Sequence, residues 1–143
     1  MRAYYEYMQA RDAALFTVVC LPGEGERFPT VIFRSPYVDA AEQQTEDEVV
    51  AAAAEAQAHF TEAGYAVVWQ HCRGRGKSTG DCIPYINERE DGLALQEWIR
   101  RQSFYNGELY LVVSVPNGCQ RRFKILPISE KEKKPDKLLF VEN

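Results

Sequence analysis

The chain has 143 residues, a length that fits one domain or part of a larger one. Hydrophobic residues make up 45% of it and charged residues 27%, which is the range of globular proteins. The formal net charge of -4 at pH 7 argues against a general nucleic-acid binder.

No apolar run approaches the ~20 residues that a membrane-spanning helix needs. The opening residues MRAYYEYMQARD lack the apolar core of a signal peptide, so we expect a cytoplasmic protein without membrane association. The cysteines have no metal-ligand spacing and the chain has only two histidines. We therefore expect reduced thiols rather than a disulfide framework or a zinc site. The four cysteines are Cys20, Cys72, Cys82 and Cys119.

The first part of the chain has the pattern of a β-hairpin. Aromatic and β-branched residues fill segments 4–8 and 15–21, on either side of a charged turn at residues 11–12. Residues 30–33 are a short apolar run, which predicts a strand buried on both faces. This strand ends at the sequence Arg-Ser-Pro-Tyr, where the proline stops regular structure.

Helices and strands then alternate. Residues 46–63 hold an alanine tract with Gly64 as the C-terminal stop, which predicts a helix. Residues 65–70 predict the next buried strand. A second helix is expected over about 88–102, with Asn87 as its N-cap and acidic residues in its first turn.

A further strand is predicted over residues 109–113. Strand, helix, strand, helix and strand with short links are typical of an α/β protein with a mostly parallel sheet. The leading hairpin supplies the antiparallel edge that such sheets often carry. The predicted fold is therefore α/β, with an antiparallel hairpin followed by mostly parallel strands and flanking helices.

The composition changes after this last strand. Five of the six lysines follow residue 116, whereas arginine is used almost exclusively before it. Residues 123–128 fit a strand, but the sequence SEKEKKPDK after them is a solvated charge run. We therefore divide the chain into a partial α/β domain, residues 1–113, and an atypical basic C-terminal tail, residues 114–143.

The sequence Gly-Lys-Ser-Thr at residues 76–79 resembles the end of a phosphate-binding P-loop. The position five residues before Gly76 holds His71, where that motif needs a glycine. Two interpretations stay open. One is a nucleotide site; the other is a structural glycine loop in which Arg73 or Arg75 pairs with acids such as Asp91.

One tyrosine and one histidine are candidates for catalytic roles. Tyr37 follows a buried strand at the edge where open α/β sheets place ligands, and its hydroxyl can donate to a developing oxyanion. The alternative is a packed tyrosine in a strand-ending turn. His71 ends the next strand near the same edge and is a candidate general base. His59 lies inside the alanine-rich helix and is interpreted as a surface or packing residue.

Ser114 is the candidate nucleophile, because it is the only serine at the end of the last predicted strand. A nucleophile elbow needs glycine two residues to each side of the serine. Val112 and Pro116 occupy those positions. Pro116 also removes a backbone N–H and restricts the residue before it.

Four segments occur in the order found in one enzyme family: FPTVIFRSPY, GYAVVWQHCRGRGKSTGD, PYINEREDGLALQEWI and YNGELYL. Over residues 3–111 the sequence resembles the N-terminal part of the Xaa-Pro dipeptidyl-peptidase-like hydrolases, which include cocaine esterase. The resemblance implies an α/β-hydrolase sheet with a Ser-Asp-His triad, and no cofactor or metal. It implies hydrolysis of small-molecule esters, amides or peptides, in some members peptides with proline second. Tyr37 matches the family's oxyanion-donating tyrosine.

From Val112 onward the sequence departs from this family. Where the family elbow reads roughly Gly-x-Ser-Tyr-Gly, the chain reads VVSVPNG, so the serine position falls on Val115 with Ser114 one residue early. The triad aspartate and histidine come later in family members. We hypothesise a truncated or frameshifted product that is inactive alone. Coding DNA with no alternative frame past codon 112 that restores the elbow would contradict this.

Two further expectations follow. An incomplete sheet leaves a strand edge open, which predicts marginal stability or self-association through that edge. The alternative to an enzyme is a non-catalytic interaction protein on a hydrolase scaffold, with its partner bound through the basic residues 120–137.

Overall fold

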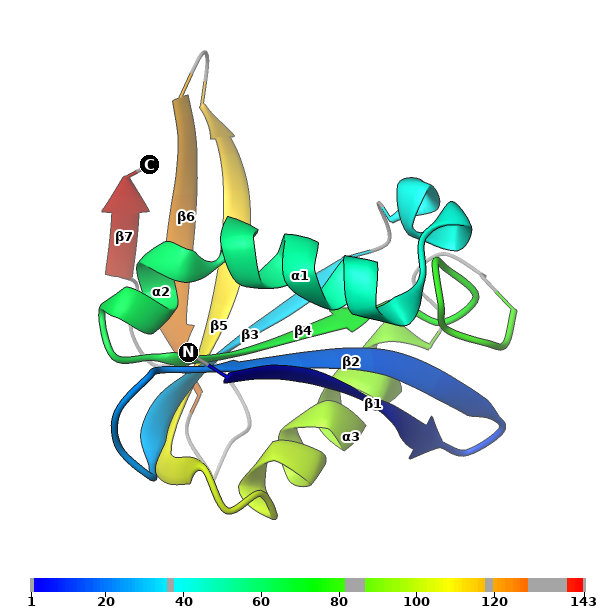
Figure 1. Cartoon of the computed structure of the whole chain (residues 1–143), viewed down its shortest axis with the longest axis horizontal. Coiled ribbons are helices and arrows are strands. Elements are labelled where there is room, and N and C mark those ends of the chain that lie inside the picture. The colour runs from blue at the N-terminus through cyan, green and yellow to red at the C-terminus, as the bar shows by residue number, and fades with distance from the viewer. Residues whose placement is uncertain (1, 36–37, 82–86, 118–119, 129–138, 143) are drawn as a thin grey trace.

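The computed structural model describes residues 2–35, 38–81, 87–117, 120–128 and 139–142. In this part of the chain, seven strands form one sheet in the order β1-β2-β4-β3-β5-β6-β7 (Figure 1). The strands are β1 (Arg2–Ala10), β2 (Ala13–Leu21), β3 (Phe28–Ser35), β4 (Ala66–His71), β5 (Tyr105–Asn117), β6 (Gln120–Pro127) and β7 (Leu139–Glu142). The helices are the 3-10 helix η1 (Asp39–Gln43), α1 (Glu46–Ala56), α2 (Ala58–Glu62) and α3 (Glu88–Arg100).

The centre of the sheet is parallel, and antiparallel strands lie on both sides of it. β3 pairs in parallel with β4 on one side and with β5 on the other. The predicted hairpin is confirmed, because β1 and β2 pair antiparallel from Arg2 to Leu21. β2 then pairs antiparallel with β4. The α/β fold expected from the sequence is therefore confirmed.

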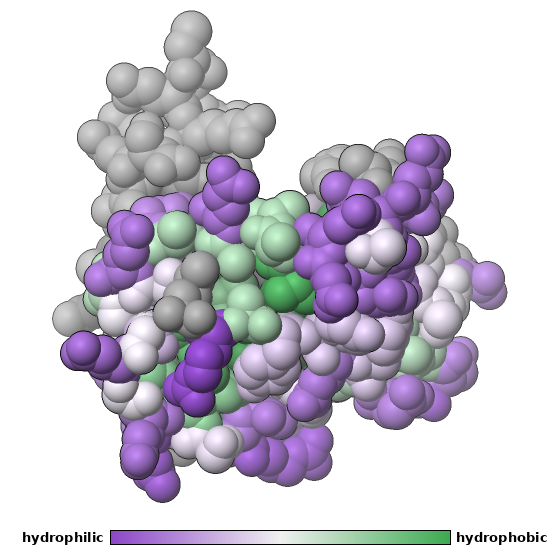
Figure 2. All heavy atoms as spheres, in the orientation of Figure 1, coloured by the Kyte–Doolittle hydropathy of each residue, from purple (hydrophilic) through white to green (hydrophobic). Residues whose placement is uncertain are grey.

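Helices cover both faces of the sheet, as Figure 1 shows, with α1 and α2 on one face and α3 on the other. The apolar side chains divide accordingly. One buried cluster lies between the sheet and the helices α1 and α2, and it includes Phe16, Val31, Val49 and Phe60. In the space-filling view, apolar colours gather over α1 (Figure 2), in keeping with the exposed alanines of this helix.

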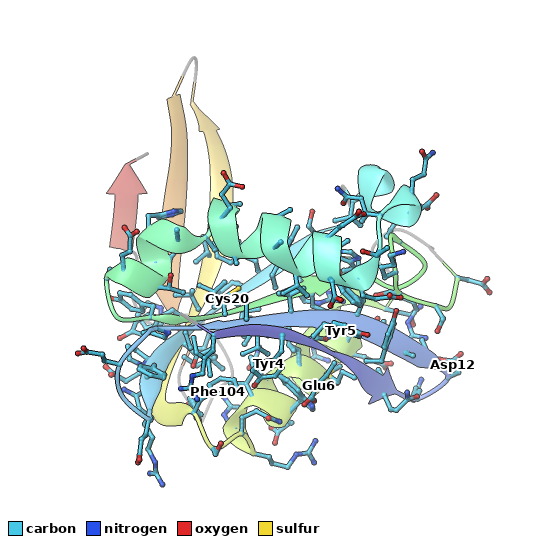
Figure 3. The ribbon with its side chains drawn as sticks, in the orientation of Figure 1. Tyr4, Tyr5, Glu6, Asp12, Cys20 and Phe104 are labelled. Carbon is cyan, nitrogen blue, oxygen red and sulfur yellow. The ribbon has the colours of Figure 1, made fainter. Side chains whose placement is uncertain are left out.

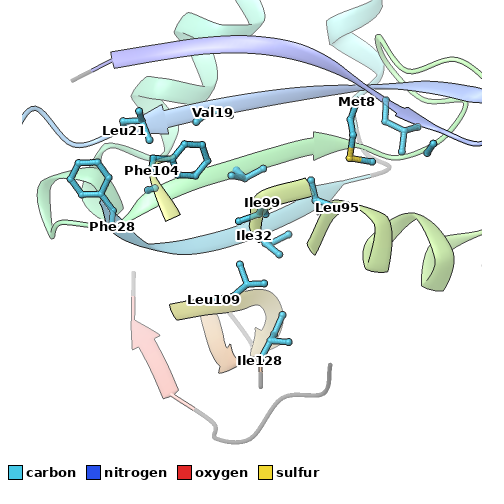
Figure 4. Close-up of a cluster of buried hydrophobic side chains, with 14 of the residues drawn as sticks. Met8, Val19, Leu21, Phe28, Ile32, Leu95, Ile99, Phe104, Leu109 and Ile128 are labelled. Carbon is cyan, nitrogen blue, oxygen red and sulfur yellow. The ribbon is translucent and has the colours of Figure 1, made fainter. Parts of the chain in front are cut away.

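A second buried cluster lies on the α3 face (Figure 4). Leu95 and Ile99 of α3 are fully buried there against Ile32 of β3 and Leu109 of β5. Ile128, just beyond β6, also joins this cluster, and its N–H donates to the Leu109 carbonyl at 2.8 Å. The C-terminal segment therefore contributes to the core.

The predicted helix over residues 46–63 is wrong in one respect: it is two helices. α1 begins with a capping box between Thr45 and Glu48 and ends at Gln57, whose φ of -103° and ψ of 11° break the helix. The break redirects α2 so that Phe60 packs edge-on against Phe33, with ring centroids 5.5 Å apart. The break thus coincides with the packing of Phe60 onto the sheet.

α3 begins where the sequence predicted, but its cap differs. Asn87 occupies the N-cap position and its side chain makes no capping hydrogen bond. Glu88, in the first turn, pairs instead with Arg34 of β3. The first turn of α3 is thus fixed by a contact with a distant strand.

Beyond residue 113 the strands continue. β5 extends to Asn117, and β6 pairs with it antiparallel where a strand over residues 123–128 was expected. β7 then pairs antiparallel with β6. The boundary drawn between residues 113 and 114 therefore falls inside β5. The edge of β5 expected to lie open is paired with β6, while self-association itself remains a prediction.

None of the helices in the described ranges has the length and apolar character needed to cross a membrane.

Candidate active site

The carboxyl ends of β3 and β4 meet at one edge of the sheet. Ser35 and His71, the last residues of these strands, are paired in register, and the Cys72 N–H donates to the Ser35 carbonyl at 3.1 Å. Open α/β sheets bind ligands outside such ends. Tyr37 follows β3 by two residues in sequence and lies outside the described residues. The loop over residues 72–81, which we call the glycine loop, covers the end of β4.

His71 is fully buried at this edge, between the rings of Phe16 and Trp69. Its Nδ1 accepts a hydrogen bond from the Lys77 N–H at 3.1 Å. Burial, with the charge of Lys77 as a smaller cause, lowers the pKa of His71 to about 4. The imidazole is therefore neutral at pH 7, and its proton is on Nε2.

The Nε2 of His71 is buried and has no hydrogen-bond partner among the described residues. Neither ring nitrogen is therefore bonded to a serine hydroxyl or a carboxylate there. A general base in a triad needs both contacts. The structure places His71 at the predicted edge without assembling a triad around it from the described side chains.

Gly76 brings the glycine loop against this imidazole. Its φ is +53°, and an added Cβ would lie 2.4 Å from Nδ1 of His71 and 2.7 Å from Cγ2 of Val38. Only glycine combines this left-handed backbone with so close an approach. The glycine therefore permits the contact that fixes His71.

Ser78 and Thr79 join the glycine loop to β2. The Ser78 hydroxyl donates to the His71 carbonyl at 2.8 Å and accepts from the Phe16 N–H at 2.9 Å. The Thr79 hydroxyl accepts from the Ala14 N–H at 2.8 Å, and the Thr79 N–H donates to the Ala14 carbonyl at 2.9 Å. Both hydroxyls thus satisfy the end of β2, where pairing with β4 stops.

The same loop satisfies its own amides. The Gly74 N–H donates to the Thr79 carbonyl, the Arg75 N–H to the Cys72 carbonyl, and the Ser78 N–H to the Arg75 carbonyl. A P-loop uses such amides to cradle phosphates. Here these three amides are occupied within the loop, and those of Lys77 and Thr79 donate to His71 and Ala14, which favours the structural interpretation of the Gly-Lys-Ser-Thr sequence.

Arg73 anchors the glycine loop to α3. Its Nε and Nη2 donate to the two carboxylate oxygens of Asp91 at 2.9 and 2.8 Å, and its Nη1 donates to Asp12 at the hairpin turn. The side chains of Arg73 and Asp91 are 8% and 3% exposed. The predicted pairing of Arg73 with Asp91 is confirmed. These hydrogen bonds raise the pKa of Arg73 and lower that of Asp12.

Arg34 forms a second polar group near the ends of these strands. Its Nε donates to Gln70 at 3.0 Å and its Nη1 to Glu88, while its Nη2 is buried and unpartnered among the described residues. Gln70 in turn donates to Thr17 at 3.0 Å. The sequence reasoning missed this group, because Arg34 and Glu88 are far apart along the chain. A buried strand ending in arginine was the available signal.

Cys72 lies beside this group, and burial raises the pKa of its thiol to about 11. Cys20 is also buried, with its pKa raised to about 11 for the same reason. Both are free thiols and stay protonated at neutral pH. Neither is therefore an activated nucleophile.

Ser114 lies within β5, where it pairs with Phe123 of β6 between two further paired positions. Its backbone is an extended strand, whereas a nucleophile elbow is a sharp strand-to-helix turn. Its role as nucleophile remains a prediction. No group of histidine, cysteine or acidic side chains in the described ranges is arranged to hold a metal ion.

The parallel core of β4, β3 and β5, with helices on both faces, has the fold of an α/β-hydrolase, which the solved structures described below share. The model of the X-Pro dipeptidyl-peptidase (S15) family matches residues 13–110, more than half of the chain. The chain belongs to this family. Among curated protein sequences, none matches it.

Solved structures agree on the fold. An α-amino acid ester hydrolase is 24% identical with a TM-score of 0.59, over 79% of this chain and 21% of its own. A CocE/NonD family hydrolase from Staphylococcus aureus is 22% identical with a TM-score of 0.56, over 76% of this chain and 21% of its own. An alpha-beta serine hydrolase homologue from Coxiella burnetii is 24% identical with a TM-score of 0.52, over 77% and 50%. The chain thus spans a fifth to a half of these structures.

Proposed function

We propose that this chain is the N-terminal part of a serine hydrolase that cleaves ester or amide bonds, peptide bonds included. The observation that carries the proposal is the family match over residues 13–110, which includes both strands that end at the candidate site. The three solved relatives named above support the same class, since their names describe hydrolases.

In the complete enzyme we expect the reaction of a Ser-Asp-His triad. The serine oxygen attacks the carbonyl carbon, histidine takes the serine proton and returns it to the leaving group, and water then releases the acyl group. Tyr37, in the segment after β3, is proposed to donate its hydroxyl to the oxyanion. No cofactor is needed for these steps.

For this chain by itself we propose that hydrolysis is absent. Two observations support this. Ser114 belongs to an antiparallel ladder, whereas a nucleophilic serine needs a strained turn. His71 is buried against the glycine loop. In that case the arginine and glycine residues of the loop supply scaffold only. A non-catalytic protein on a hydrolase scaffold is then the second candidate.

Labelling with a fluorophosphonate probe tests whether this chain by itself has a nucleophilic serine. Purified chain, the Ser114→Ala variant and a commercial serine esterase are incubated with the probe and compared on a gel. We expect labelling of the esterase only. Labelling of the wild-type chain that disappears in Ser114→Ala would establish Ser114 as a nucleophile and overturn the proposed inactivity.

The family function needs a separate test. Fusing residues 1–111 to the C-terminal remainder of a related hydrolase restores an elbow and triad. Esterase activity that falls at least about tenfold on Tyr37→Phe supports the oxyanion role. Unchanged activity in that variant would contradict it.

A further inference from the structure

β1 presents a long open strand edge. It pairs only with β2 among the described strands, with unbroken register from Arg2 to Ala10. Natural edge strands are protected by proline, by bulges or by charges. β1 has no proline and no bulge, and Arg2 and Glu6 are its only charged residues. Its edge therefore suits pairing with another strand.

The hydrogen bonds of β2 identify which backbone groups of β1 are open. The N–H groups of Ala14 and Phe16 donate to side chains of the glycine loop, away from β1. Their partners across the ladder are Gln9 and Tyr7. Since backbone groups alternate in direction along a strand, the odd-numbered residues of β1 direct their N–H and C=O groups to the open edge.

The side chains of β1 also alternate. Tyr5 and Tyr7 lie on the α1 face, where both rings contact Phe16. They are 37% and 39% exposed, and are the large apolar side chains that stand out as exposed in the described chain. Tyr4 and Glu6 lie on the α3 face, as Figure 3 shows with Tyr5 on the other side.

The two ends of the hairpin differ in their attachments. At the turn, Arg11 pairs with Glu90 of α3 and Asp12 pairs with Arg73. The first half of β1 has no such ties among the described residues. The free stretch of edge therefore lies around Tyr4.

We propose that a second copy of this chain pairs with this edge, β1 against β1, antiparallel and with the two-fold axis at Tyr4. In this register each Arg2 lies opposite Glu6 of the partner copy and the two Tyr4 residues face each other. Ala3 and Tyr5 exchange backbone hydrogen bonds, which matches the open groups of the edge. The contact is self-complementary, as an isologous dimer requires.

Charge selects this register over its neighbours. With the axis at Tyr5, Arg2 would face Met8 and lose its ionic partner. With the axis at Glu6, the two Glu6 carboxylates would face each other, which is unfavourable in an antiparallel pair. The Tyr4 register alone satisfies both charges, and this is why we assign a second copy to the edge.

The first test measures the dimer by light scattering after size exclusion and by sedimentation equilibrium. We expect a concentration-dependent dimer whose dissociation constant rises about tenfold or more in Arg2→Glu and in Glu6→Arg, because each creates two like-charge pairs. The double variant Arg2→Glu/Glu6→Arg should restore the wild-type value. Tyr5→Pro should abolish the dimer, because it removes an outward N–H that β2 does not use.

The second test locates the register by oxidative cross-linking. Tyr4→Cys should form a disulfide across the axis, since non-hydrogen-bonded partners bring their Cβ atoms closest. Gln9→Cys, outside the paired stretch, is the matched control, and Tyr5→Cys reports the neighbouring register. Circular dichroism confirms that each variant is folded.

Three results would overturn the proposal. These are a wild-type chain that stays monomeric up to on the order of 100 µM, a dimer insensitive to both charge reversals and to Tyr5→Pro, or cross-linking through Tyr5→Cys in place of Tyr4→Cys.

Discussion

Two segments of the molecule follow parallel strands of the same sheet and differ in what holds them. The glycine loop follows β4, and side-chain hydrogen bonds of Arg73, Ser78 and Thr79 fix it to α3 and β2. The segment after Val112 follows the core part of β5 and continues as an antiparallel ladder with β6. Its described apolar contact with the core is Ile128.

The difference shows how far along the chain the fold depends on the particular residues of the family. The glycine loop depends on particular residues, since each anchor needs one guanidinium, hydroxyl or glycine in one position. A strand ladder depends mainly on backbone pairing, which many sequences can supply. A sequence that departs from its family can therefore continue a sheet while losing the turn that chemistry needs.

Removing Arg73 tests the glycine loop and should lower the free energy of unfolding more than the other changes. Arg73→Ala leaves the carboxylate of Asp91 buried without its partner, and we expect a loss of about 3–5 kcal/mol in the free energy of unfolding. Urea denaturation followed by tryptophan fluorescence measures it. Arg11→Ala, which breaks an exposed ion pair with Glu90, is the control and should cost under about 1 kcal/mol. Equal effects of the two variants would mean that Arg73 does not anchor the loop.

Ile128 tests the other segment. Ile128→Ala should cost about 2–4 kcal/mol if the residues after β5 belong to the core, because Ile128 is buried against Leu109. A detached tail would predict almost no change. The same denaturation experiment decides, with the exposed Glu108→Ala as control.

Much of the core was predictable from local sequence. The apolar runs at residues 30–33 and 65–70 predicted β3 and β4, and Gly64, with φ +93°, ends the helical segment as expected. The break at Gln57 was not predictable, because the segment contains no glycine or proline that would mark it, and it accompanies a contact of Phe60 with the distant Phe33. The cap of α3 was misjudged for a similar reason, since Glu88 is drawn to Arg34.

The candidate site was predictable only in part. The edge formed by β3 and β4 and the pairing of Arg73 with Asp91 followed from element order and charge. Burial of His71 by Gly76 could not be foreseen, because it depends on a backbone approach that one glycine permits. Tyr37 and Ser114 were chosen from family likeness and strand position, and their catalytic roles remain predictions.

The titration of His71 gives the smallest expected effect and tests the environment of the candidate site. Its pKa in the folded chain is lowered to about 4 from 6.5. The unfolded chain therefore binds the proton more readily between these values, and stability should fall as pH drops from about 6.5 to about 4. We expect about 1–3 kcal/mol from this group.

Two measurements check this. In a His59→Gln background, the remaining imidazole NMR signal should titrate near pH 4. The His71→Gln variant keeps an acceptor for the Lys77 N–H and should lose its share of the pH-dependent stability. An imidazole that titrates near 6.5 in the folded chain would show that water reaches His71. The glycine loop would then open at the edge where the family carries its chemistry, and His71 would regain its standing as a candidate general base.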